Sequence, residues 1–501
     1  MNYLLDNNVI IDILSKARSE IYIDSIKVFK HLKEKNFNLF ISSSSLDNIE
    51  FTLFKEIKKR FNYSNKDTLS FTHIAIKKFL EQVEIAKTPS YIEIDYDDIE
   101  DSQIIASAKA LDAKVITRDE GMLKKYPNQT LHPSTFTLSP HSIDFANLKK
   151  QHFLYYQEIE KEIDNVLNKT NFIMGEPVKT LEKNLEKFTG AKHAITCSSG
   201  TDALLLAMMA LDIKPDDEII TTPFTFIATA ETIALLGAKP VFVDIDERTY
   251  NIDATKIEEK ITDKTKAIMP VSLYGQPPNL DAIQAIADKY KLKVIIDGAQ
   301  SFGSTYKGKT DSNLGDISTT SFFPAKPLGC YGDGGAVFTN DDELAQKMKS
   351  LRVHGQSKRY HHKYIGMGGR MDTIQCAIVN VKLKYYPQDL ALRQEVASKY
   401  IKALGSKVLT LPYIAKETTS AFAQYSIRVK NRDKLQAKLK DAKIPTAVHY
   451  PRPLHLQECL GYLGYKEGDF LISEIVSKEI MSIPMNPYVS DEEIKYISKH
   501  L

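Results

Sequence analysis

The chain has 501 residues and a formal net charge of +2, with 43% hydrophobic and 26% charged residues. These values are typical of globular proteins, and so small a net charge excludes attraction of nucleic acid by the molecule as a whole. Because the chain is too long for one ordinary hydrophobic core, we expect about three domains, or two of which one is large.

The cysteines and the N-terminus indicate the compartment. Cys197, Cys330, Cys376 and Cys459 are scattered without CxxC spacing, which favours neither a disulfide framework nor a zinc site and is typical of the reducing cytoplasm. The opening "MNYLLDNNVIIDIL" carries acids and lacks the basic segment of a signal peptide. No apolar run approaches the roughly 18 residues that span a bilayer. We therefore expect a cytoplasmic protein without a membrane partner.

Residues 1–135 alternate short apolar runs with helical segments. The runs "YLLDNN", "FNLFISSS" and "AKVITRDE" are strand-like, and "DSQIIASAKALDA" has apolar residues at the i, i+3 and i+4 spacing of a helix. This alternation predicts an α/β domain. The following stretch "YPNQTLHPSTFTLSPHS" is rich in Pro, Ser and Thr, which is typical of a linker. We place the linker at residues 136–142.

Four acids stand at the ends of the front strand-like runs or where helices begin: Asp6, Glu50, Asp101 and Asp119. If the strands are parallel, these side chains converge on one edge of the sheet, where several carboxylates repel strongly without a cation. Mg²⁺ or Mn²⁺ prefers oxygen ligands and can activate water against a phosphodiester. The alternative is that the four are ordinary surface carboxylates that never meet.

Residues 143–501 continue as a longer α/β region. The runs "HAITCSS", "DEIITTP", "KPVFVDID", "TKAIMPVS" and "LKVIIDGA" alternate with helical segments, which predicts a mostly parallel sheet with helices on both faces. After about residue 385 the pattern changes to a helix, a strand-like "AQYSIRV" and further helices. We therefore expect a large domain over 143–385 and a smaller C-terminal subdomain over 386–501.

The stretch "SFFPAKPLGCYGDGG" places Lys326 between aromatic residues and a glycine-rich turn. Lysine is rarely buried unless it is paired, so this side chain either extends to the surface or has lost its charge by reaction. Fixing a lysine as a Schiff base on pyridoxal phosphate achieves the second, and the cofactor then acts as an electron sink. Such a site needs an acid for the pyridine nitrogen, donors for the phosphate and an aromatic face for the ring.

Each of these parts has a candidate. Asp297 ends the run "LKVIIDGA", at the carboxyl edge where open α/β sheets bind ligands. Gly200 and Thr201 start a helix in "CSSGTDALLLAM" and would direct backbone N–H groups at an anion. Phe226 in "PFTFIATAE" could stack on a planar ring. Taken singly, such an acid is more often a cap and such a phenylalanine more often core, so their combination with one lysine carries the prediction.

Residues 143–501 resemble the DegT/DnrJ/EryC1/StrS family of sugar aminotransferases, from "NFIMGEPVKTLEKNLEKFTGAKHAITCSSGTDALLLAMMAL" to "HYPRPLHLQ". The resemblance implies the fold type I architecture of pyridoxal phosphate-dependent transferases, with a large α/β domain and a smaller C-terminal α+β subdomain. "HGQSKRYHH" and "DTIQCAI" favour the WbpE-like branch, which transaminates a UDP-linked 3-keto-2-acetamido uronic acid. Relatives that dehydrate carry histidine in place of the lysine, so Lys326 favours transamination.

The resemblance also implies roles for single residues. It makes Lys326 the catalytic lysine that joins the cofactor, Asp297 the partner of the pyridine nitrogen and Gln300 a contact of the phenolic oxygen. It makes Gly200, Thr201 and Ser321 the contacts of the phosphate, and Phe226 the residue that stacks on the ring. The implied substrate contacts are Arg370, His449 and Tyr450.

One position departs from the family pattern. Where the family has an asparagine in a "GxNxR" segment that reaches the phosphate of the neighbouring subunit, this chain reads "GMGGR", with Gly368 at that place. One hydrogen bond to a charged acceptor, worth about 1.5–3 kcal/mol, would be missing. We therefore expect weaker retention of the cofactor.

Residues 1–135 resemble a PIN domain, the metal-dependent ribonuclease fold of many bacterial toxins. The segments "LLDNNVIID", "ISSSSLDNIE" and "IEDSQIIASAKALDAKVITRDEGML" carry the resemblance. It implies a Mg²⁺ or Mn²⁺ site and a possible RNA substrate. The implied metal ligands are Asp6, Glu50, Asp101 and Asp119, with Asn8 and Thr117 as small polar neighbours.

The sequence thus predicts a bifunctional cytoplasmic chain. A pyridoxal phosphate-dependent aminotransferase would act as a homodimer on a keto sugar linked to a nucleoside diphosphate, with glutamate as the amino donor, in polysaccharide biosynthesis. A ribonuclease domain would precede it. The alternative is an RNA-cleaving or RNA-binding PIN protein whose aminotransferase-like half is an inactive dimeric scaffold, and Gly368 is the feature that favours it.

Overall fold

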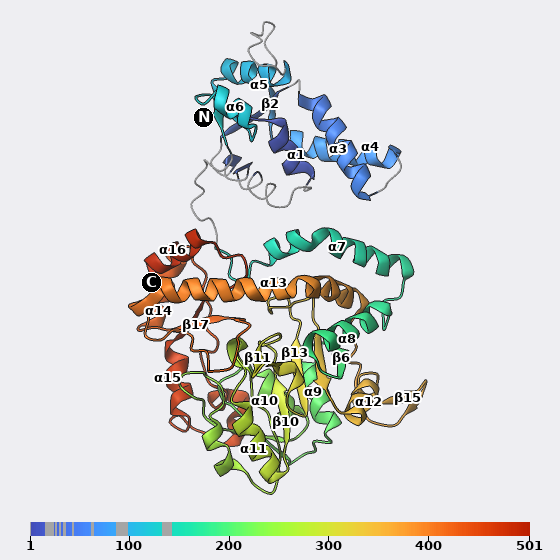
Figure 1. The fold of residues 1–501 in the computed structure, drawn as a ribbon, viewed down its shortest axis with the longest axis vertical. Helices are drawn as coiled ribbons and strands as arrows, with labels where there is room; N and C mark the ends of the chain where they lie inside the picture. The colour runs from blue at the N-terminus through green and yellow to red at the C-terminus, as the bar shows by residue number, and fades with distance from the viewer. Residues whose placement is uncertain are drawn as a thin grey trace. The chain divides into compact units, whose positions relative to one another are not determined.

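The chain forms two compact units, Met1–His141 and Ser142–Leu501. A computed structural model describes residues 2–15, 25, 28–29, 32–33, 37–42, 45–61, 65–86, 99–132 and 143–501. Figure 1 traces both units, and each contains hydrophobic clusters of its own. The predicted linker at residues 136–142 lies outside the described residues.

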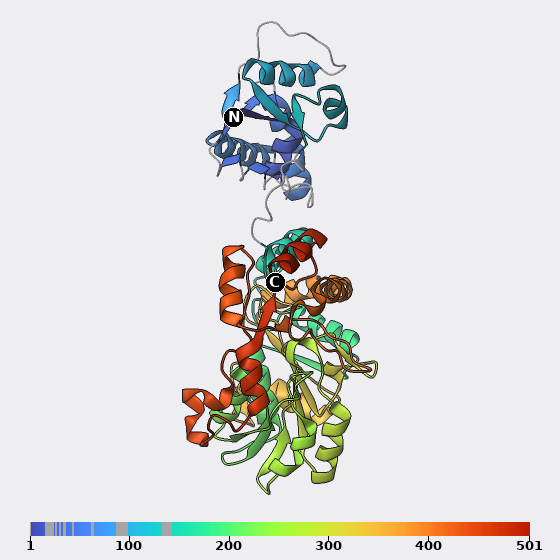
Figure 2. The ribbon, with the colours of Figure 1, turned by 90° about the vertical axis from the view of Figure 1, so that its left-hand side faces the viewer.

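The first unit is built on a five-stranded parallel sheet in the order β3-β2-β1-β4-β5. Because alternate strand residues face opposite sides, Tyr3 and Leu5 pack with α1, α3 and α4, whereas Leu4 packs with α5 and α6. Figure 2 shows the sheet between these helices. The elements are β1 (Asn2–Leu5), α1 (Asn7–Ser15), β2 (Asn38–Ser42), α3 (Leu46–Phe61), α4 (Asn65–Leu80), β3 (Glu84–Ala86), α5 (Ile99–Ala110), β4 (Ala113–Ile116), α6 (Glu120–Lys125) and β5 (Thr130–Leu131).

The second unit is built on a seven-stranded sheet in the order β6-β14-β13-β10-β9-β7-β8. All neighbouring strands in it are parallel except at β14, which is antiparallel to both β13 and β6. The predicted mostly parallel sheet is therefore confirmed. Its strands are β6 (His193–Cys197), β7 (Glu218–Thr221), β8 (Lys239–Phe242), β9 (Thr265–Ile268), β10 (Lys293–Asp297), β13 (Ile317–Ser321) and β14 (Gly335–Thr339).

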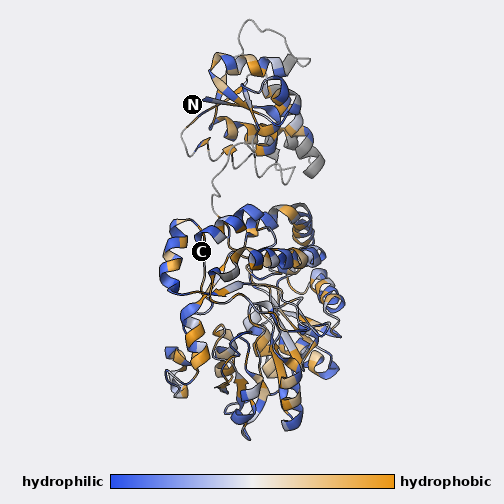
Figure 3. Cartoon of the chain, turned by 60° about the vertical axis from the view of Figure 1, so that its left-hand side comes forward, coloured by the Kyte–Doolittle hydropathy of each residue, from blue (hydrophilic) through white to orange (hydrophobic). Residues whose placement is uncertain are grey.

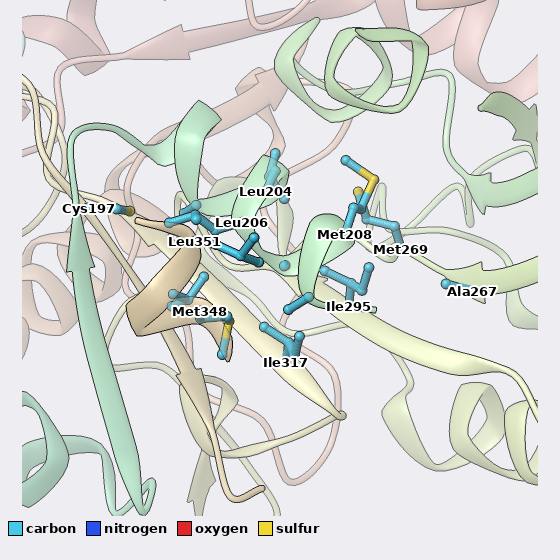
Figure 4. Packing of buried hydrophobic residues seen from close by; sticks show 14 of the residues in the cluster. Cys197, Leu204, Leu206, Met208, Ala267, Met269, Ile295, Ile317, Met348 and Leu351 are labelled. Carbon is cyan, nitrogen blue, oxygen red and sulfur yellow. The ribbon is translucent and has the colours of Figure 1, made fainter. Parts of the chain in front are cut away.

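Helices cover both faces of this sheet. Ile295 of β10 packs in a cluster with residues of α9, α10 and α12, part of which Figure 4 shows. Its neighbours Val294 and Ile296 pack on the other face with α11, and α8 and α13 cover the remainder of that face. In Figure 3 the central strands are coloured mainly hydrophobic. The helices are α8 (Glu176–Thr189), α9 (Gly200–Ala210), α10 (Ala228–Leu235), α11 (Leu280–Tyr290), α12 (Asp342–Leu351) and α13 (Thr373–Leu404).

The C-terminal part packs around an antiparallel pair, β17 and β18. The predicted boundary at residue 385 falls inside α13, a continuous helix of 32 residues that runs beside α7 (Figure 1). Although α7 and α13 are long, no helix in the described ranges is apolar enough to cross a membrane. The remaining elements are α7 (Leu148–Lys169), β17 (Tyr425–Arg428), α14 (Arg432–Asp441), α15 (Leu471–Glu479), β18 (Ile480–Ile483), α16 (Asp491–His500) and the short hairpins β11–β12 (Thr305–Tyr306, Lys309–Thr310) and β15–β16 (Gln356–Lys358, His361–His362).

Candidate active site

Lys326 lies on the loop that follows β13. Its backbone N–H donates to the Phe323 carbonyl at 2.9 Å, and the Cys330 N–H donates to the Phe322 carbonyl at 2.7 Å, so the loop folds back on itself. The side chain is half-buried. Burial lowers its pKa, and the negative charge of Asp297 opposes that shift. Lys326 therefore loses its proton to become an uncharged amine more easily than a solvated lysine does.

Asp297 is the last residue of β10 and is buried. Its Oδ2 accepts a hydrogen bond from the Thr229 hydroxyl at 2.7 Å, and its Oδ1 accepts one from the Ala299 N–H at 3.2 Å. Burial raises the pKa of this carboxyl, whereas the two donors and the positive charge of Lys326 lower it. Thr229 lies in α10, three residues after Phe226, and sequence reasoning did not identify it.

Aromatic and amide side chains lie beside this acid. Gln300 donates from Nε2 to the Tyr450 hydroxyl at 3.1 Å, and its Oε1 accepts from the Tyr274 N–H at 2.7 Å. The ring of Phe226 lies 6.1 Å from that of Tyr450 and is 54% exposed. A large aromatic ring with this much accessible surface provides a face on which a planar group can stack.

The start of α9 forms an anion site. The Ser199 hydroxyl caps the helix by accepting from the Asp202 N–H at 3.0 Å. A Cβ atom at Gly200 would lie 2.7 Å from the Cβ of Ser321, the last residue of β13, so the close approach of these two segments requires glycine. Gly200 and Thr201 occupy the first turn, where N–H groups lack helical partners. Together with the Ser321 hydroxyl they suit a phosphate.

His449 and Tyr450 come from the C-terminal part of the unit. His449 Nδ1 lies 2.9 Å from the Ser482 hydroxyl. Burial lowers the pKa of His449 to about 4, and the positive charge of Lys326 adds to that shift. His449 is therefore neutral at pH 7 and lies near enough to Lys326 to be affected by its charge.

Arg370 and Gly368 lie on the segment that leads into α13. A Cβ atom at Gly368 would lie 3.2 Å from Cε1 and 3.3 Å from Nε2 of His354, and 3.8 Å from Nη2 of Arg370. The imidazole of His354 thus lies beside the place where the family pattern has the asparagine side chain. Across the described residues, no hydrogen bond or ion pair joins Arg370 to Lys326 or Asp297.

In the first unit, two of the four predicted acids lie close together. Asp6 follows β1 and is buried, with Oδ2 accepting from the Thr117 hydroxyl and Oδ1 from the Asn7 N–H, both at 2.6 Å. Burial raises its pKa, and the negative charge of Asp119 raises it further. Asp119 follows the neighbouring strand β4 and caps α6 by accepting from the Met122 N–H at 2.7 Å.

The other two acids belong to helices. Glu50 of α3 lines a cavity of about 450 Å³ with residues of α4, and Asp101 belongs to α5. Within the ranges that the structure describes, no three His, Cys, Asp or Glu side chains form a group that could hold a metal ion. The Mg²⁺ or Mn²⁺ site therefore stays a prediction from the sequence. An ion pair that sequence reasoning missed, Arg118 with the buried Asp12, lies beside Asn8.

Comparison with known families gives two matches along the chain. Residues 155–501 match the DegT/DnrJ/EryC1/StrS aminotransferase family, and residues 2–120 match a PIN domain. Both predicted resemblances are therefore confirmed, with the aminotransferase match beginning within α7.

Curated proteins and solved structures give the same picture for the second unit. The UDP-2-acetamido-2-deoxy-3-oxo-D-glucuronate aminotransferase of Pseudomonas aeruginosa is 49% identical over 355 residues, which cover 71% of this chain and 98% of that protein. A dTDP-3-amino-3,6-dideoxy-alpha-D-galactopyranose transaminase of Aneurinibacillus thermoaerophilus is 40% identical, over 71% of this chain and 97% of that protein. The crystal structure of S. venezuelae DesV with a ketimine intermediate superposes with a TM-score of 0.71 at 31% identity, over 72% of this chain and 97% of that chain. The crystal structure of a Brucella abortus aminotransferase of the same family has a TM-score of 0.68 at 38% identity, over 72% of this chain and 98% of that chain.

Proposed function

The chain belongs to the DegT/DnrJ/EryC1/StrS aminotransferase family, and we propose that it transfers an amino group to a keto sugar linked to a nucleoside diphosphate. The observation that carries the proposal is the pair of Asp297 and Lys326. A buried carboxylate at the carboxyl edge of β10 lies near enough to a lysine of lowered pKa for their charges to interact. Perturbed groups of opposite charge in such a place are typical of catalytic sites.

The residues present fit pyridoxal phosphate. The first turn of α9 with Ser321 would hold the phosphate, the exposed face of Phe226 would cover the ring, and Asp297 would meet the pyridine nitrogen. The close approach of Gly200 and Ser321 supports this fit, because any side chain at residue 200 would fill the space between the two segments. When bound, the cofactor supplies an electron sink for the carbon that loses or gains a proton.

The protein's own groups have separable tasks. Lys326 Nζ, with its lowered pKa, can accept the proton from the α-carbon of the amino donor and return one to the sugar carbon. Asp297 in its ionised form would stabilise a proton on the pyridine nitrogen of the cofactor. The hydrogen bond from Thr229 favours that ionised form. His449, neutral at pH 7, can exchange hydrogen bonds with a sugar hydroxyl without adding charge.

The substrate class rests on the relatives. The Pseudomonas aeruginosa protein is named for a UDP-linked 3-oxo sugar acid, and a relative from Acidithiobacillus ferrooxidans, 37% identical, for a UDP-linked 3-dehydro sugar. We therefore propose a UDP-linked 3-keto-2-acetamido sugar or uronic acid as the acceptor, with glutamate as the donor. Arg370, His449 and Tyr450 are the proposed substrate contacts.

The proposed assembly is a homodimer. Large apolar side chains near the catalytic loop and the start of α13 are exposed: Phe172 is 44%, Ile173 50% and Phe323 52% accessible. Thr373 at the start of α13 donates to the Phe172 carbonyl, so these residues lie on neighbouring segments. Large apolar side chains with this much exposed surface support an interaction site.

The test is direct conversion. Purified full-length protein with pyridoxal phosphate, glutamate and a UDP-linked 3-keto sugar should yield the amino sugar and 2-oxoglutarate, both followed by mass spectrometry. Lys326→Ala should yield neither, whereas Lys307→Ala, a surface lysine paired with Asp281, should behave as the wild type. Undiminished conversion by Lys326→Ala would refute the proposal.

A second candidate activity is RNA cleavage by residues 2–120, which the PIN-domain match favours. Incubation of the full chain with structured and unstructured RNA, with Mg²⁺ or Mn²⁺ added, tests it. Cleavage that disappears in Asp6→Asn would support the activity, because Asp6 is the buried acid at the strand edge. Cleavage that persists in Asp6→Asn would assign it to a contaminant or another site.

A further inference from the structure

Lys382, a charged side chain outside the site described above, is buried beside the catalytic loop. It lies on the inner face of α13 and is 3% exposed. Its Nζ donates to the Gly329 carbonyl at 2.7 Å and lies 4.4 Å from the ring centre of Tyr331. A buried ammonium is costly unless its partners compensate, and here both partners belong to the loop that carries Lys326.

The loop segment that Lys382 contacts is tightly constrained. A Cβ atom at Gly329 would lie 2.7 Å from the Phe323 carbonyl oxygen and 2.5 Å from that of Pro324, so Gly329 packs directly on the turn before Lys326. The Lys326 N–H donates to the same Phe323 carbonyl. A shift of the Gly329 backbone would therefore disturb the Phe323 carbonyl to which the Lys326 N–H is bonded.

Other residues of α13 hold the same region. Gln375 Oε1 accepts from the Tyr331 N–H at 2.8 Å, and Gln375 precedes Lys382 by two helical turns, on the same face. Tyr386, one turn further, donates to the Phe302 carbonyl at 2.5 Å, next to the segment that carries Gln300. The helix thus contacts both loops of the candidate site through one stripe of side chains, of which Lys382 carries the charge.

We propose that Lys382 is a positioning residue for amino transfer, which holds the catalytic lysine in place through the Gly329 carbonyl. The inference rests on the proposed function of Lys326. A charged donor to a peptide carbonyl makes a stronger hydrogen bond than a neutral one. Loss of the ammonium therefore loosens the loop and displaces the Lys326 backbone.

The groups that face Lys382 define its titration. Cys330 and Tyr331 face it from the loop, Asp389 from α13 itself, and His152 of α7 lies behind Tyr331, with Nδ1 2.7 Å from the tyrosine hydroxyl. Burial lowers the pKa of Lys382 to about 8, and the neighbouring Cys330 and Asp389 oppose this shift. The ammonium, and with it the stronger hydrogen bond, is present below about pH 8 and is lost above it.

The experiment compares Lys382→Met, Lys382→Gln and Lys384→Met in the full chain. Lys384 is the matched control, because it lies on the same helix but is exposed and paired with Glu158. The first readout needs no cofactor: hydrogen exchange of the Lys326 and Cys330 amides. Lys382→Met should speed this exchange about tenfold, as the loss of a charged hydrogen bond predicts, whereas Lys384→Met should not change it.

The second readout is kinetic. With pyridoxal phosphate and glutamate, Lys382→Met should lower kcat about tenfold with little change in KM, as misplacement of a reacting group predicts. The ratio of wild-type to mutant kcat should shrink above pH 8. Lys382→Gln, which keeps a neutral donor, should restore exchange protection in part and lack the pH dependence.

Unchanged amide exchange and an unchanged pH profile in Lys382→Met would overturn the inference, and so would a lower melting temperature with neither readout moved. If Lys382→Met does not fold, Lys382→Gln decides: an exchange rate and pH profile equal to those of the wild type would overturn it. Wild-type protein that transfers no amino group would refute the proposed function instead, and the exchange readout would still test the contact.

Discussion

Two buried aspartates, one in each unit, stand at the carboxyl ends of parallel strands and differ in the charge beside them. Asp6 follows β1 and Asp297 ends β10, and each accepts a hydrogen bond from a threonine hydroxyl and from a nearby backbone N–H. Burial raises the pKa of both carboxyls. The positive charge of Lys326 opposes this rise at Asp297, whereas the negative charge of Asp119 adds to it at Asp6.

The comparison shows that the fold positions the acid, whereas the neighbouring side chains determine its chemistry. Both sheets bring an acid to the edge where ligands bind, so the strand end alone does not define the chemistry. In the second unit the opposite charge comes from the chain itself, because Lys326 lies near enough to Asp297 for their charges to interact. In the first unit the neighbouring charge is of the same sign, because Asp119 raises the pKa of the buried Asp6 further.

The largest expected effect tests the Asp297 half of the comparison. Asp297→Asn removes the charge that holds a proton on the cofactor nitrogen, and amino transfer should fall on the order of 10³-fold, within the range for loss of acid–base assistance. Steady-state kinetics with saturating pyridoxal phosphate measure it. Asp288→Asn, at an exposed acid on α11, is the control. A loss of activity of less than tenfold would show that Asp297 is not the group that holds the proton on the cofactor nitrogen.

The next effect concerns the threonine that supports this acid. Thr229→Val removes a hydrogen bond to the carboxylate, worth about 1.5–3 kcal/mol, so activity at neutral pH should fall at least tenfold. Because Thr229 lowers the pKa of Asp297, its removal raises that pKa, and the acidic limb of the pH–rate profile should move to higher pH. Thr232→Val, whose hydroxyl bonds only within α10, should leave the limb in place.

A smaller effect is expected at Gly368. Introducing asparagine there should tighten retention of pyridoxal phosphate by a few-fold to tenfold, about 1 kcal/mol, once the imidazole of His354 is removed from its path. Gly368→Asn should therefore act weakly alone and more strongly with His354→Ala, since a Cβ atom at residue 368 approaches that ring to 3.2 Å. Equilibrium dialysis measures the change. Equal affinity in the wild type and in both variants would show that this segment does not reach the phosphate.

The smallest effect tests the independence of the two regions. Asp6→Asn should change amino transfer by less than about twofold, as expected for sites in separately folded units that share no partner residues. Because the folded-state pKa of Asp6 is raised, its contribution to stability is present below the unfolded pKa and is lost as the pH rises through the folded value. Asp6→Asn should therefore raise the unfolding midpoint of the first unit at pH 7, with a smaller difference at pH 3. Calorimetry measures both, and a loss of amino transfer would reveal coupling between the units.

Sequence reasoning succeeded where the information is local. The run "LKVIIDGA" marks a buried strand that ends in an acid, and "CSSGTDALLLAM" marks a helix start after a strand, because hydrophobic runs and turn residues are encoded by neighbours in the chain. Asp297 and Gly200 therefore occupy the predicted positions on their elements. The resemblance to the family added the residues that no periodicity marks, such as Gln300 and His449.

The partners of these residues were not predictable, because they come from distant segments. Thr229 meets Asp297 across 68 residues, and Lys382 meets Gly329 across 53. Neither a threonine in a helix nor a lysine in a helix differs from its neighbours in the sequence. The four front acids illustrate the same limit, since their spacing predicted one site, and among them the described structure shows one pair, Asp6 and Asp119, close enough for their charges to interact.

The most direct test of the central claim is the visible absorbance of the full-length protein with pyridoxal phosphate, before and after glutamate is added. The account predicts a band of the protein-bound cofactor that disappears on addition of glutamate and is absent in Lys326→Ala, because Lys326 provides the bond to the cofactor. Asp6→Asn should reproduce the wild-type spectra. A band that persists in Lys326→Ala, or does not respond to glutamate, would contradict the assignment of Lys326 and Asp297 as the catalytic pair.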